Sequence, residues 1–445
     1  MAISTETRAI CRGCYQQVAA ETATVTCAQC GSIFHQDCWE RHGECISASC
    51  MIAGVSGPCA HQSAAEAQTA PGHDGMAEGT VWGIVALAVS VLIVAGVVAV
   101  RLGAPLNTVL VVGVVIAALT FDYVNGMHDA GNAIATVIST RVLTPAAALV
   151  MAAMLNLVGA LAFSGVAKGI AEKFADMGQV EALGLAITPM MILCGLVGAS
   201  LWSFFTARIG LPVSTSHSLF GGLIGVFLLA GIPLNKAYLG TIFLFIVLAP
   251  LMAFTVGWML MHAINFLVHT TAPYRINKVF RVLQVFSAAA MAFMHGSNDA
   301  QKAMGIITMA LFSVGFVAKG PDGVDVPTWV KIACALMMAL GTGFGGMRVI
   351  KTLGHKIIKL APIHGFTAET VAAATIMLVT HLHIPISTTH VISSSILGIG
   401  ASRRLSTVRW GVAGNIVAAW IFTIPSCALA GSGLYCLVRW MLRIA

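Results

Sequence analysis

Apolar residues form long, almost uninterrupted runs from residue 81 onward, separated by short polar stretches that often contain Gly or Pro. A run of about 20 apolar residues is long enough to cross the hydrocarbon core of a membrane as a helix. Several runs reach that length, whereas others are shorter and interrupted. The pattern predicts an all-α polytopic membrane protein, with apolar runs at 81–100, 106–124, 144–165, 185–207, 217–231, 238–267, 279–294, 303–318, 329–347, 366–382, 391–401 and 410–438.

Composition agrees with a membrane protein and argues against a soluble one. Hydrophobic residues make up 58% of the chain and charged residues 9%, whereas soluble domains carry about 25% charged residues. Charge is divided unevenly, because residues 1–79 hold 3 Lys plus Arg against 8 Asp plus Glu, and residues 80–445 hold 21 against 9. Basic residues this sparse in an apolar body set membrane orientation, so we expect no nucleic-acid partner.

Cysteine is concentrated at the start of the chain, where 8 of the 12 cysteines precede residue 60. Cys-x2-Cys pairs and a His-x2-Cys pair offer ligands at the spacing of tetrahedral zinc sites. The candidate ligands are Cys11, Cys14, Cys27, Cys30, His35, Cys38, Cys45 and Cys50. No apolar signal segment precedes them, so we prefer zinc to the alternative, a disulfide framework. The four later cysteines stand alone in apolar runs and are predicted to be packing residues.

The run from Cys27 to Cys38 resembles part of the cross-braced zinc fingers of the RING and PHD class. The resemblance implies one zinc ion on Cys11, Cys14, His35 and Cys38, and a second on Cys27, Cys30, Cys45 and Cys50. The last pair departs from the pattern because four residues separate its members, and the substitutes that stay open are His42, Cys59 and His61. Residues 51–79, rich in Ala, Gly, Ser, His and Gln, are predicted to be a flexible linker.

Two short polar motifs occur twice in the apolar body, in the same order. Asn125–Ala133 aligns with His295–Ala303 at a distance of 170 residues and shares Gly-x-x-Asp-Ala. Leu211–His217 aligns with Ile384–His390 at a distance of 173 residues and shares Pro-x-Ser-Thr-x-His. Such a repeat predicts two related halves, and broken helices at matching places point to the binding site of a transporter. We therefore predict two helix breaks in each half, all converging on one site.

Four carboxylates lie within the apolar runs or their predicted breaks: Asp122, Asp129, Asp299 and Glu369. A carboxylate inside a membrane is costly and by default belongs to an ion or proton pathway. Asp129 and Asp299 are the stronger candidates for handling a cation, because they occupy equivalent places in the two halves. Asp122 and Glu369 lack such counterparts, so structural pairing and a role in coupling both stay open for them.

The Pro-x-Ser-Thr-x-His motifs place three hydroxyl side chains directly after a proline, where a helix is expected to begin. Hydroxyl groups and the free N–H groups of a helix N-terminus together form an anion site. Because the motif occurs twice, in register with the paired aspartates, we prefer ligand binding to simple helix capping. His217 and His390 follow the hydroxyls and are interpreted as structural. Carboxylates for a cation beside hydroxyls for an anion predict cation-coupled import of a small oxyanion.

Basic residues indicate how the spans are oriented. If a helix at 81–100 runs outward from the cytoplasm and each half has an odd number of crossings, the halves are inverted. Twelve Lys or Arg residues then fall on the cytoplasmic side, as the positive-inside rule requires. They are Arg141, Arg208, Arg275, Lys278, Arg281, Arg348, Lys351, Lys356, Lys359, Arg403, Arg404 and Arg409. The more acidic loops 166–184 and 319–328 fall outside, and the zinc head is cytoplasmic, where thiols stay reduced.

The paired motifs resemble the signatures of the PiT family of inorganic phosphate transporters, over about residues 107–438. The resemblance implies two inverted repeats of broken helices and hairpins that meet at mid-membrane, and phosphate uptake by symport across the cell membrane. The residues it assigns to the cation are Asp129, Asn132 and Asp299, and Glu369 matches a further acidic position of the family. The residues it assigns to phosphate are Ser214, Thr215, Ser216, Ser387, Thr388, Thr389, Asn298 and Gln301.

The sequence departs from the sodium-coupled members of that family at two positions. His128 replaces the first Asn of their motif, and Lys302 replaces the last Asn of its second copy. A fixed ammonium beside Asp299 competes with sodium, whereas His128 titrates near neutrality and could join a proton path. We therefore prefer protons to sodium, place Lys302 with the phosphate ligands, and note that the pattern looks more like the bacterial low-affinity branch. Phosphate travelling alone and phosphate travelling as a neutral complex with a divalent metal both stay open.

Other readings of the sequence remain as alternatives. The body could be a permease for sulfate or another oxyanion, or the membrane anchor of a zinc-finger signalling protein. We expect no enzyme, because the body contains no nucleophile–base set. A protein partner for the head and assembly into a homo-oligomer stay open. The predicted domains are a zinc head at 1–50, a linker at 51–79, an extra transmembrane helix at 80–105, a first repeat at 106–270 and a second repeat at 271–445.

Overall fold

The computed structural model describes residues 24–26, 33–35, 105–321 and 323–444. In the N-terminal unit, β1 (Thr24–Thr26) and β2 (Ile33–His35) form an antiparallel hairpin. The cysteines of the predicted zinc head, the linker and the helix predicted at 81–100 lie outside the described residues. The second unit is helical and is described by itself.

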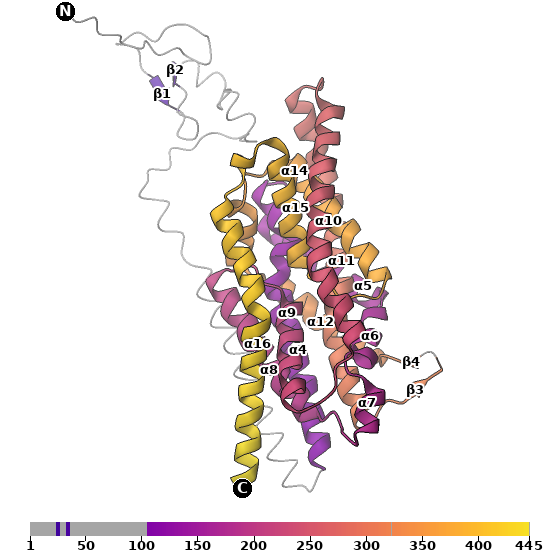
Figure 1. Cartoon of the computed structure of the whole chain (residues 1–445). Helices are drawn as coiled ribbons and strands as arrows, with labels where there is room; N and C mark the ends of the chain where they lie inside the picture. The colour runs from indigo at the N-terminus through magenta and orange to yellow at the C-terminus, as the bar shows by residue number, and fades with distance from the viewer. Residues whose placement is uncertain (1–23, 27–32, 36–104, 322, 445) are drawn as a thin grey trace, which may run out of the picture. The chain divides into compact units, whose positions relative to one another are not determined.

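The helical part of the chain is shown in Figure 1. Its helices are α4 (Leu106–Ser139), α5 (Pro145–Ala162), α6 (Gly165–Lys173), α7 (Met177–Ala182), α8 (Pro189–Ile209), α9 (Thr215–Leu229), α10 (Lys236–Val268), α11 (Pro273–Ser313), α12 (Thr328–Phe344), α13 (Met347–Lys351), η2 (Thr352–Lys356), α14 (Pro362–His381), α15 (Thr388–Arg403), η3 (Leu405–Thr407) and α16 (Trp410–Ile444). A short hairpin of β3 (Lys319–Gly320) and β4 (Gly323–Val324) lies between α11 and α12. α5 and α8 begin with a Thr cap followed by Pro at the first helical position, which is a strong local start signal.

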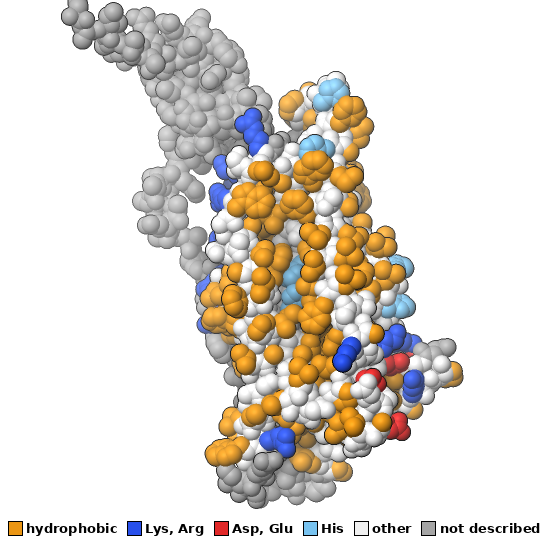
Figure 2. All heavy atoms as spheres, in the orientation of Figure 1, with side chains coloured by type: hydrophobic (Ala, Val, Ile, Leu, Met, Phe, Trp, Pro, Cys, Tyr) orange, Lys and Arg blue, Asp and Glu red, His pale blue; other side chains and the backbone are white. Residues whose placement is uncertain are grey.

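The helices confirm the prediction of an all-helical protein with many membrane spans. Within the described residues, seven helices are long and apolar enough to cross a membrane, or eight if the bent pair of α12 with α13–η2 counts as one span. Large apolar side chains such as Phe266 and Leu429, each 75% exposed, face outward, as expected for a surface covered by lipid. Figure 2 shows apolar side chains over most of the visible face, with acidic side chains only toward one end.

The Gly-x-x-Asp motifs do not break their helices, so that part of the sequence prediction is wrong. α4 and α11 run without interruption through both motifs. Glycine serves close packing here: a Cβ atom on Gly126 would lie 2.3 Å from the carbonyl oxygen of Met338 in α12. A Cβ atom on Gly296 would lie 2.3 Å from the carbonyl oxygen of Asn156 in α5. The polar residues of the motifs stay inside a helix because neighbouring helices bury them.

The Pro-x-Ser-Thr-x-His motifs do interrupt the chain, as predicted. α8 ends at Gly210, which adopts the left-handed conformation, and residues 211–214 are non-helical before α9 begins. α14 ends in a similar way before His383, which also has a positive φ, and α15 begins at Thr388. Each pair, α8 with α9 and α14 with α15, packs as a helical hairpin. The hairpins therefore present two helix N-termini to the interior.

The helices of the two halves correspond in order, α4 to α11, α5 to α12, α8–α9 to α14–α15, and α10 to α16. Each half packs against the other, because α9 contacts α16 and α15 contacts α10. The close contacts of Gly126 with Met338 and of Gly296 with Asn156 are counterparts, since the glycines lie 170 residues apart and their partners 182. These two counterpart glycines therefore make the same kind of close helix contact.

Among the described residues, exposed acidic side chains lie toward one end of the helices, whereas basic side chains lie at both ends. Arg281, near the start of α11, donates a hydrogen bond of 2.8 Å to the carbonyl oxygen of Arg141, just after α4. α4 thus ends where α11 begins, so these corresponding helices run in opposite directions. At the other end of the helices, Lys168 of α6 pairs with Asp325 at 2.5 Å. We call the end that carries Arg141 the basic end, and the end that carries Asp325 the acidic end.

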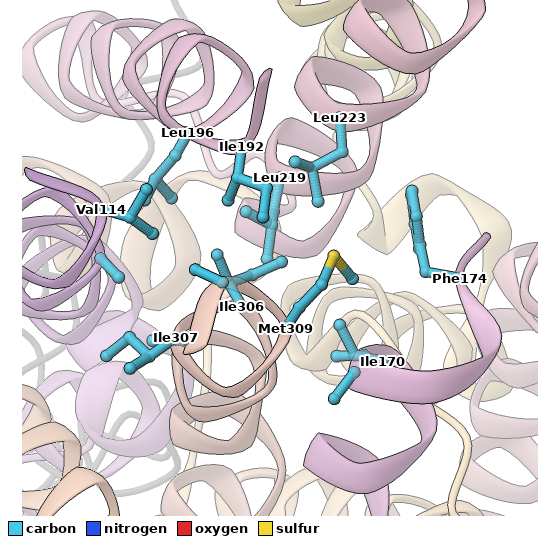
Figure 3. Packing of buried hydrophobic residues seen from close by; sticks show 14 of the residues in the cluster. Val114, Ile170, Phe174, Ile192, Leu196, Leu219, Leu223, Ile306, Ile307 and Met309 are labelled. Atoms are coloured by element: carbon cyan, nitrogen blue, oxygen red, sulfur yellow. The ribbon is translucent and has the colours of Figure 1, made fainter. Parts of the chain in front are cut away.

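Buried apolar residues form two clusters, one on either side of a polar layer. In α4 the first cluster ends at Phe121 and the second begins at Ala133. Between them lie buried polar residues, His128, Asp129 and Asn132. Figure 3 shows part of the first cluster, the one toward the acidic end. The polar layer is therefore enclosed by apolar packing above and below.

Three of the four later cysteines are buried as predicted, namely Cys194, Cys334 and Cys427. Cys436 of α16 is exposed instead, so the prediction that it packs inside the protein is wrong. The reason is its helix, because only 22% of the most apolar window of α16 is buried. A small apolar side chain costs little on a surface that faces lipid.

Candidate functional site

α4 supplies the first central carboxylate, and two helix N-termini bond to it. Asp129 is 1% exposed and accepts hydrogen bonds from Thr215 of α9 (3.1 Å) and Thr389 of α15 (3.3 Å). The carboxylate therefore ties the start of each hairpin's second helix to α4. The paired motifs predicted this convergence.

His128 lies between two hydrogen-bond acceptors. Its Nδ1 lies 2.6 Å from Oδ1 of Asp129, and its Nε2 lies 3.2 Å from the carbonyl oxygen of Leu211. A neutral imidazole has one N–H donor only. Both contacts are satisfied at once only when the pair carries one proton more than a neutral imidazole and a carboxylate. The geometry therefore offers a place for a proton between His128 and Asp129.

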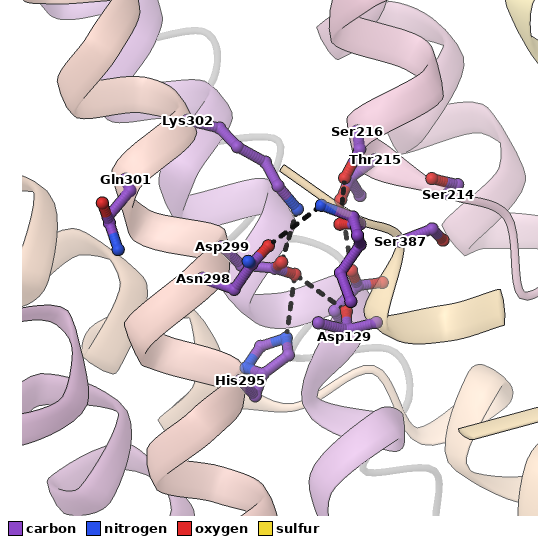
Figure 4. Close-up of polar contacts among 12 residues, drawn as sticks. Asp129, Ser214, Thr215, Ser216, His295, Asn298, Asp299, Gln301, Lys302 and Ser387 are labelled. Atoms are coloured by element: carbon purple, nitrogen blue, oxygen red, sulfur yellow. Dashed lines mark hydrogen bonds and ion pairs between the residues drawn. The ribbon is translucent and has the colours of Figure 1, made fainter. Parts of the chain in front are cut away.

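α11 supplies the second central carboxylate, which is surrounded by donors. Asp299 accepts a hydrogen bond from Nζ of Lys302, one helical turn away, and another from Thr388 at 3.0 Å. His295 Nε2 lies 3.2 Å from its other side. All of these residues are almost fully buried. Figure 4 shows the Lys302 side chain directed at Asp299 from the side of the hairpins, with His295 on the opposite side.

The hydroxyls of the hairpin motifs divide into two groups. Ser214 and Ser387 cap their helices, each accepting a hydrogen bond of 3.2 Å from the backbone N–H of the histidine three residues later. Ser216 donates to the carbonyl oxygen of Ile386 at 3.0 Å, which joins the two hairpins. The threonines Thr215, Thr388 and Thr389 face the central carboxylates instead.

Asn132 joins the centre to the second hairpin. Its amide nitrogen donates to Thr389 (2.9 Å) and Thr388 (3.3 Å), while its buried amide oxygen has no hydrogen-bond partner. A buried amide oxygen without a partner is a place for a water molecule or a ligand. Asn132, which the sequence assigned to the cation, therefore contacts two of the threonines that it assigned to phosphate.

The ammonium group of Lys302 occupies the region where a coupling cation was expected. Asp129, His295 and Asp299 place one potential ligand atom each within 4.8 Å of one another, close enough to share an ion. Lys302 already supplies a positive charge to Asp299, and a second cation there would be repelled by it. The centre is therefore a set of two carboxyl groups, one ammonium and the histidine that contacts Asp129.

One predicted phosphate residue and one predicted coupling residue lie away from this centre, and a second predicted phosphate residue borders it. Gln301 points elsewhere, because its amide oxygen accepts the backbone N–H groups of Val166 (2.8 Å) and Ala167 at the start of α6. Asn298 lies beside Asp299 and joins the second hairpin, because its amide donates to Thr380 at 2.9 Å and its oxygen accepts the backbone N–H of Ile386 at 3.4 Å. Glu369 lies in the apolar cluster toward the basic end, in contact with Thr136, Gln284 and Ser287.

His295 is the site residue that sequence reasoning left without a role. Besides Asp299, it contacts Asn156 of α5 at 3.0 Å, and Asn156 donates to Thr342 of α12 at 2.8 Å. The available signal was its spacing, four residues before Asp299 on one face of a helix. His217 and His390 contact each other, with ring centroids 4.4 Å apart, and His390 stacks on Trp420.

Known proteins similar to this chain are named as phosphate transporters. The family model described as "Phosphate transporter family" matches residues 125–431. A protein of Bacillus subtilis named "Probable low-affinity inorganic phosphate transporter" is 42% identical over 329 residues, which cover 74% of this chain and 96% of the relative. A protein of the same name from Rhizobium meliloti is 43% identical over 73% of this chain and 96% of its own length.

A solved structure shares the fold. The chain titled "The sodium-dependent phosphate transporter" superposes with a TM-score of 0.67 at 24% identity, over 74% of this chain and 99% of that one. The family consists of transporters, so the expectation that this chain is not an enzyme is confirmed. With more than half of its length matched by the family model, this chain belongs to the phosphate transporter family.

Proposed function

We propose that this chain imports inorganic phosphate across the cell membrane by proton symport, through two inverted repeats that meet at the central carboxylates. The relatives above are named as low-affinity inorganic phosphate transporters, which supports phosphate as the substrate. The opposite directions of α4 and α11 support the inverted arrangement. The observation that supports proton coupling is the central set of contacts, in which Lys302 pairs with Asp299 and His128 lies between Asp129 and a backbone carbonyl.

Phosphate fits between the starts of α9 and α15. Helix N-termini attract anions through free N–H groups and the helix dipole, and hydroxyls add donors that suit tetrahedral oxygens. Thr215, Thr388 and Thr389 are placed to donate to an anion once it displaces them from the carboxylates. Lys302 adds the positive charge that compensates the anion. Phosphate carried as a complex with a divalent metal would bring a further positive charge beside Lys302, so we favour phosphate alone.

Protons suit this centre better than sodium. Sodium would have to share Asp299 with a buried ammonium, at a cost that rises as the surroundings become less polar. A proton instead can be shared between His128 and Asp129, whose Nδ1 and Oδ1 atoms lie 2.6 Å apart. Binding of the phosphate anion then follows protonation, because the added positive charge favours the anion in the same enclosed space.

Membrane orientation follows from the basic end, which we place in the cytoplasm. α4 begins at the acidic end, so a preceding helix at 80–105 would bring the N-terminal head back to the cytoplasm.

We also propose that the head binds two zinc ions. The support for this is the sequence, in which Cys-x2-Cys pairs and a His-x2-Cys pair have the spacing of tetrahedral zinc sites. Zinc analysis of the purified chain tests this, and about two zinc ions per chain are expected. If Cys27→Ser with Cys30→Ser leaves no zinc at all, the assignment of that pair to the second site alone is wrong.

The test of the transport proposal is uptake of radiolabelled phosphate into proteoliposomes. An imposed pH gradient is expected to drive uptake, an imposed sodium gradient is expected to have no effect, and excess sulfate should not compete. Asp299→Asn leaves Lys302 as an unpaired buried ammonium, so uptake should fall at least about tenfold. The matched control is Asp325→Asn, which alters a carboxylate that is 79% exposed. Uptake driven only by sodium would overturn proton coupling, and inhibition by sulfate would overturn phosphate selectivity.

A further inference from the structure

A buried polar group lies between the central site and the basic end. The Glu369 carboxylate of α14 is fully buried and accepts hydrogen bonds from Thr136 of α4 and from Ser287 and Gln284 of α11, the last at 3.4 Å. Thr140 donates in turn to Gln284 at 2.9 Å. We call this set the Glu369 network. A carboxylate held only by neutral donors in an apolar cluster costs folding energy, so it calls for a functional reason.

The Glu369 network continues directly from the central site. Asn132, Thr136 and Thr140 follow one another on the same face of α4 at intervals of one helical turn. Asn132 bonds to the second hairpin, and its unpaired amide oxygen lies at the start of this row. Thr140 stands at the end of α4, beside Arg141 of the basic end. The row therefore leads from the carboxylates of the centre to one surface of the protein.

The corresponding place in the other half is apolar throughout. In the other half, Ile306 stands in the place of Thr136, Ala117 in that of Ser287, Val114 in that of Gln284, Leu196 in that of Glu369 and Ala310 in that of Thr140. All five counterparts are buried in the cluster toward the acidic end. Figure 3 shows Val114, Leu196 and Ile306 directed toward one another. Since equivalent surroundings fold with aliphatic residues in one half, the Glu369 network is not required by the fold.

We propose that Glu369 is the proton-release group of the transport cycle, and that it works toward the basic end only. This inference rests on the proton symport proposed above. When phosphate leaves the centre, the proton held by the His128–Asp129 pair is released through water at Asn132. Thr136 gives its hydroxyl proton to a Glu369 oxygen and takes the arriving one. The neutral Glu369 then passes its proton to water at Thr140 and returns to a carboxylate.

The surroundings of Glu369 leave it free to gain and lose a proton. Its direct contacts from α4 and α11 are hydroxyl and amide groups, none of them charged. α10 and α15 also pack on α14, next to Glu369. Met261 of α10 contacts Thr367, and Ser395 of α15 donates to the carbonyl oxygen of Ala368. In the half toward the acidic end, the aliphatic counterparts offer no group that accepts a proton. Toward the acidic end the buried carboxylate is Asp122 of α4, which has no hydrogen-bond partner among the described residues and does not occupy a counterpart place of the Glu369 network. Protons that reach the centre from that side therefore have no equivalent of this network.

The experiment compares two modes of transport in proteoliposomes of the full chain. Net accumulation driven by a pH gradient requires proton release in every cycle, whereas exchange of internal for external phosphate at equal pH does not. Glu369→Gln keeps the size and polarity of the protonated side chain. We expect accumulation to fall at least about tenfold and exchange to stay within about twofold of the wild type. The matched control is Glu181→Gln, the same change on the exposed surface of α7, which should alter neither.

The possible outcomes separate clearly. Normal accumulation by Glu369→Gln would overturn the inference, and so would loss of both modes in a variant whose thermal stability in detergent matches the wild type. Thr136→Val retains the carboxylate and removes the hydroxyl that leads to it, so it should slow accumulation more than exchange. Equal effects on both modes would count against the relay. Failure of proton coupling itself would be recognised earlier, because the wild type would then not accumulate phosphate on a pH gradient.

Discussion

At the scale of single residues, the centre is defined by a lysine where the first half has an asparagine. Lys302 is the counterpart of Asn132, and the two differ in what they can share with a carboxylate. The ammonium bonds to Asp299 and supplies a fixed charge, whereas the amide bonds to hydroxyls and leaves an oxygen unpaired. One side chain thus decides whether the second carboxylate is available to a mobile cation.

Lys302→Asn is expected to exchange the coupling ion. With the ammonium removed, Asp299 becomes an unpaired carboxylate that a sodium ion can neutralise. Uptake in proteoliposomes should become dependent on an imposed sodium gradient, and the drive by a pH gradient should weaken at least about tenfold. The control is Lys319→Asn, which removes an exposed ammonium from β3. A variant that stays indifferent to sodium and keeps full pH-driven uptake would show that Lys302 does not set ion selectivity.

At the scale of helices, glycine contacts hold the unbroken helices that carry the carboxylates. Gly296→Ala places a methyl group against the carbonyl oxygen of Asn156, so α11 and α5 must separate. Overpacking of this kind costs about 1–3 kcal/mol. The midpoint of thermal unfolding in detergent should therefore fall. Gly433→Ala in α16 is the control, because nothing lies within 4 Å of its added methyl group. An equal midpoint for the two variants would contradict the packing role of Gly296.

The ion pair between Lys168 and Asp325 links α6 to the segment before α12. We expect it to make no contribution to the pH dependence of uptake. The hydrogen bond and charge of Lys168 lower the pKa of the Asp325 carboxyl below its usual value of 3.8. A carboxylate with a lowered pKa stays charged above that value, and its pairing is lost only in more acidic solution. Asp325→Asn should therefore leave the shape of the uptake profile between about pH 5 and 8 unchanged. A shift of that profile would place a titrating group at the acidic end.

Sequence patterns could predict the helical hairpins but not the continuity of α4 and α11. A proline followed by hydroxyls marks a helix start through local chemistry, so the starts at Thr215 and Thr388 were predictable. The polar run around Asp129 indicates a helix break when it is considered without its tertiary partners. Its neighbours come from α9 and α15, far away in sequence. Gln301 is similar, because only tertiary packing places the start of α6 beside it.

At the scale of the whole chain, the number of crossings decides where the N-terminal head lies. α4 begins at the acidic end and runs to the basic end, which we place in the cytoplasm. One further helix at 80–105 must then start in the cytoplasm. A protease site inserted into the linker at 51–79 should be cut in inside-out vesicles and protected in right-side-out vesicles. The opposite pattern would mean either that 80–105 does not cross the membrane or that the basic end faces outward. A second protease site between α9 and α10, at the acidic end, distinguishes these two explanations. The vesicle type in which this second site is cut is reversed only if the basic end faces outward.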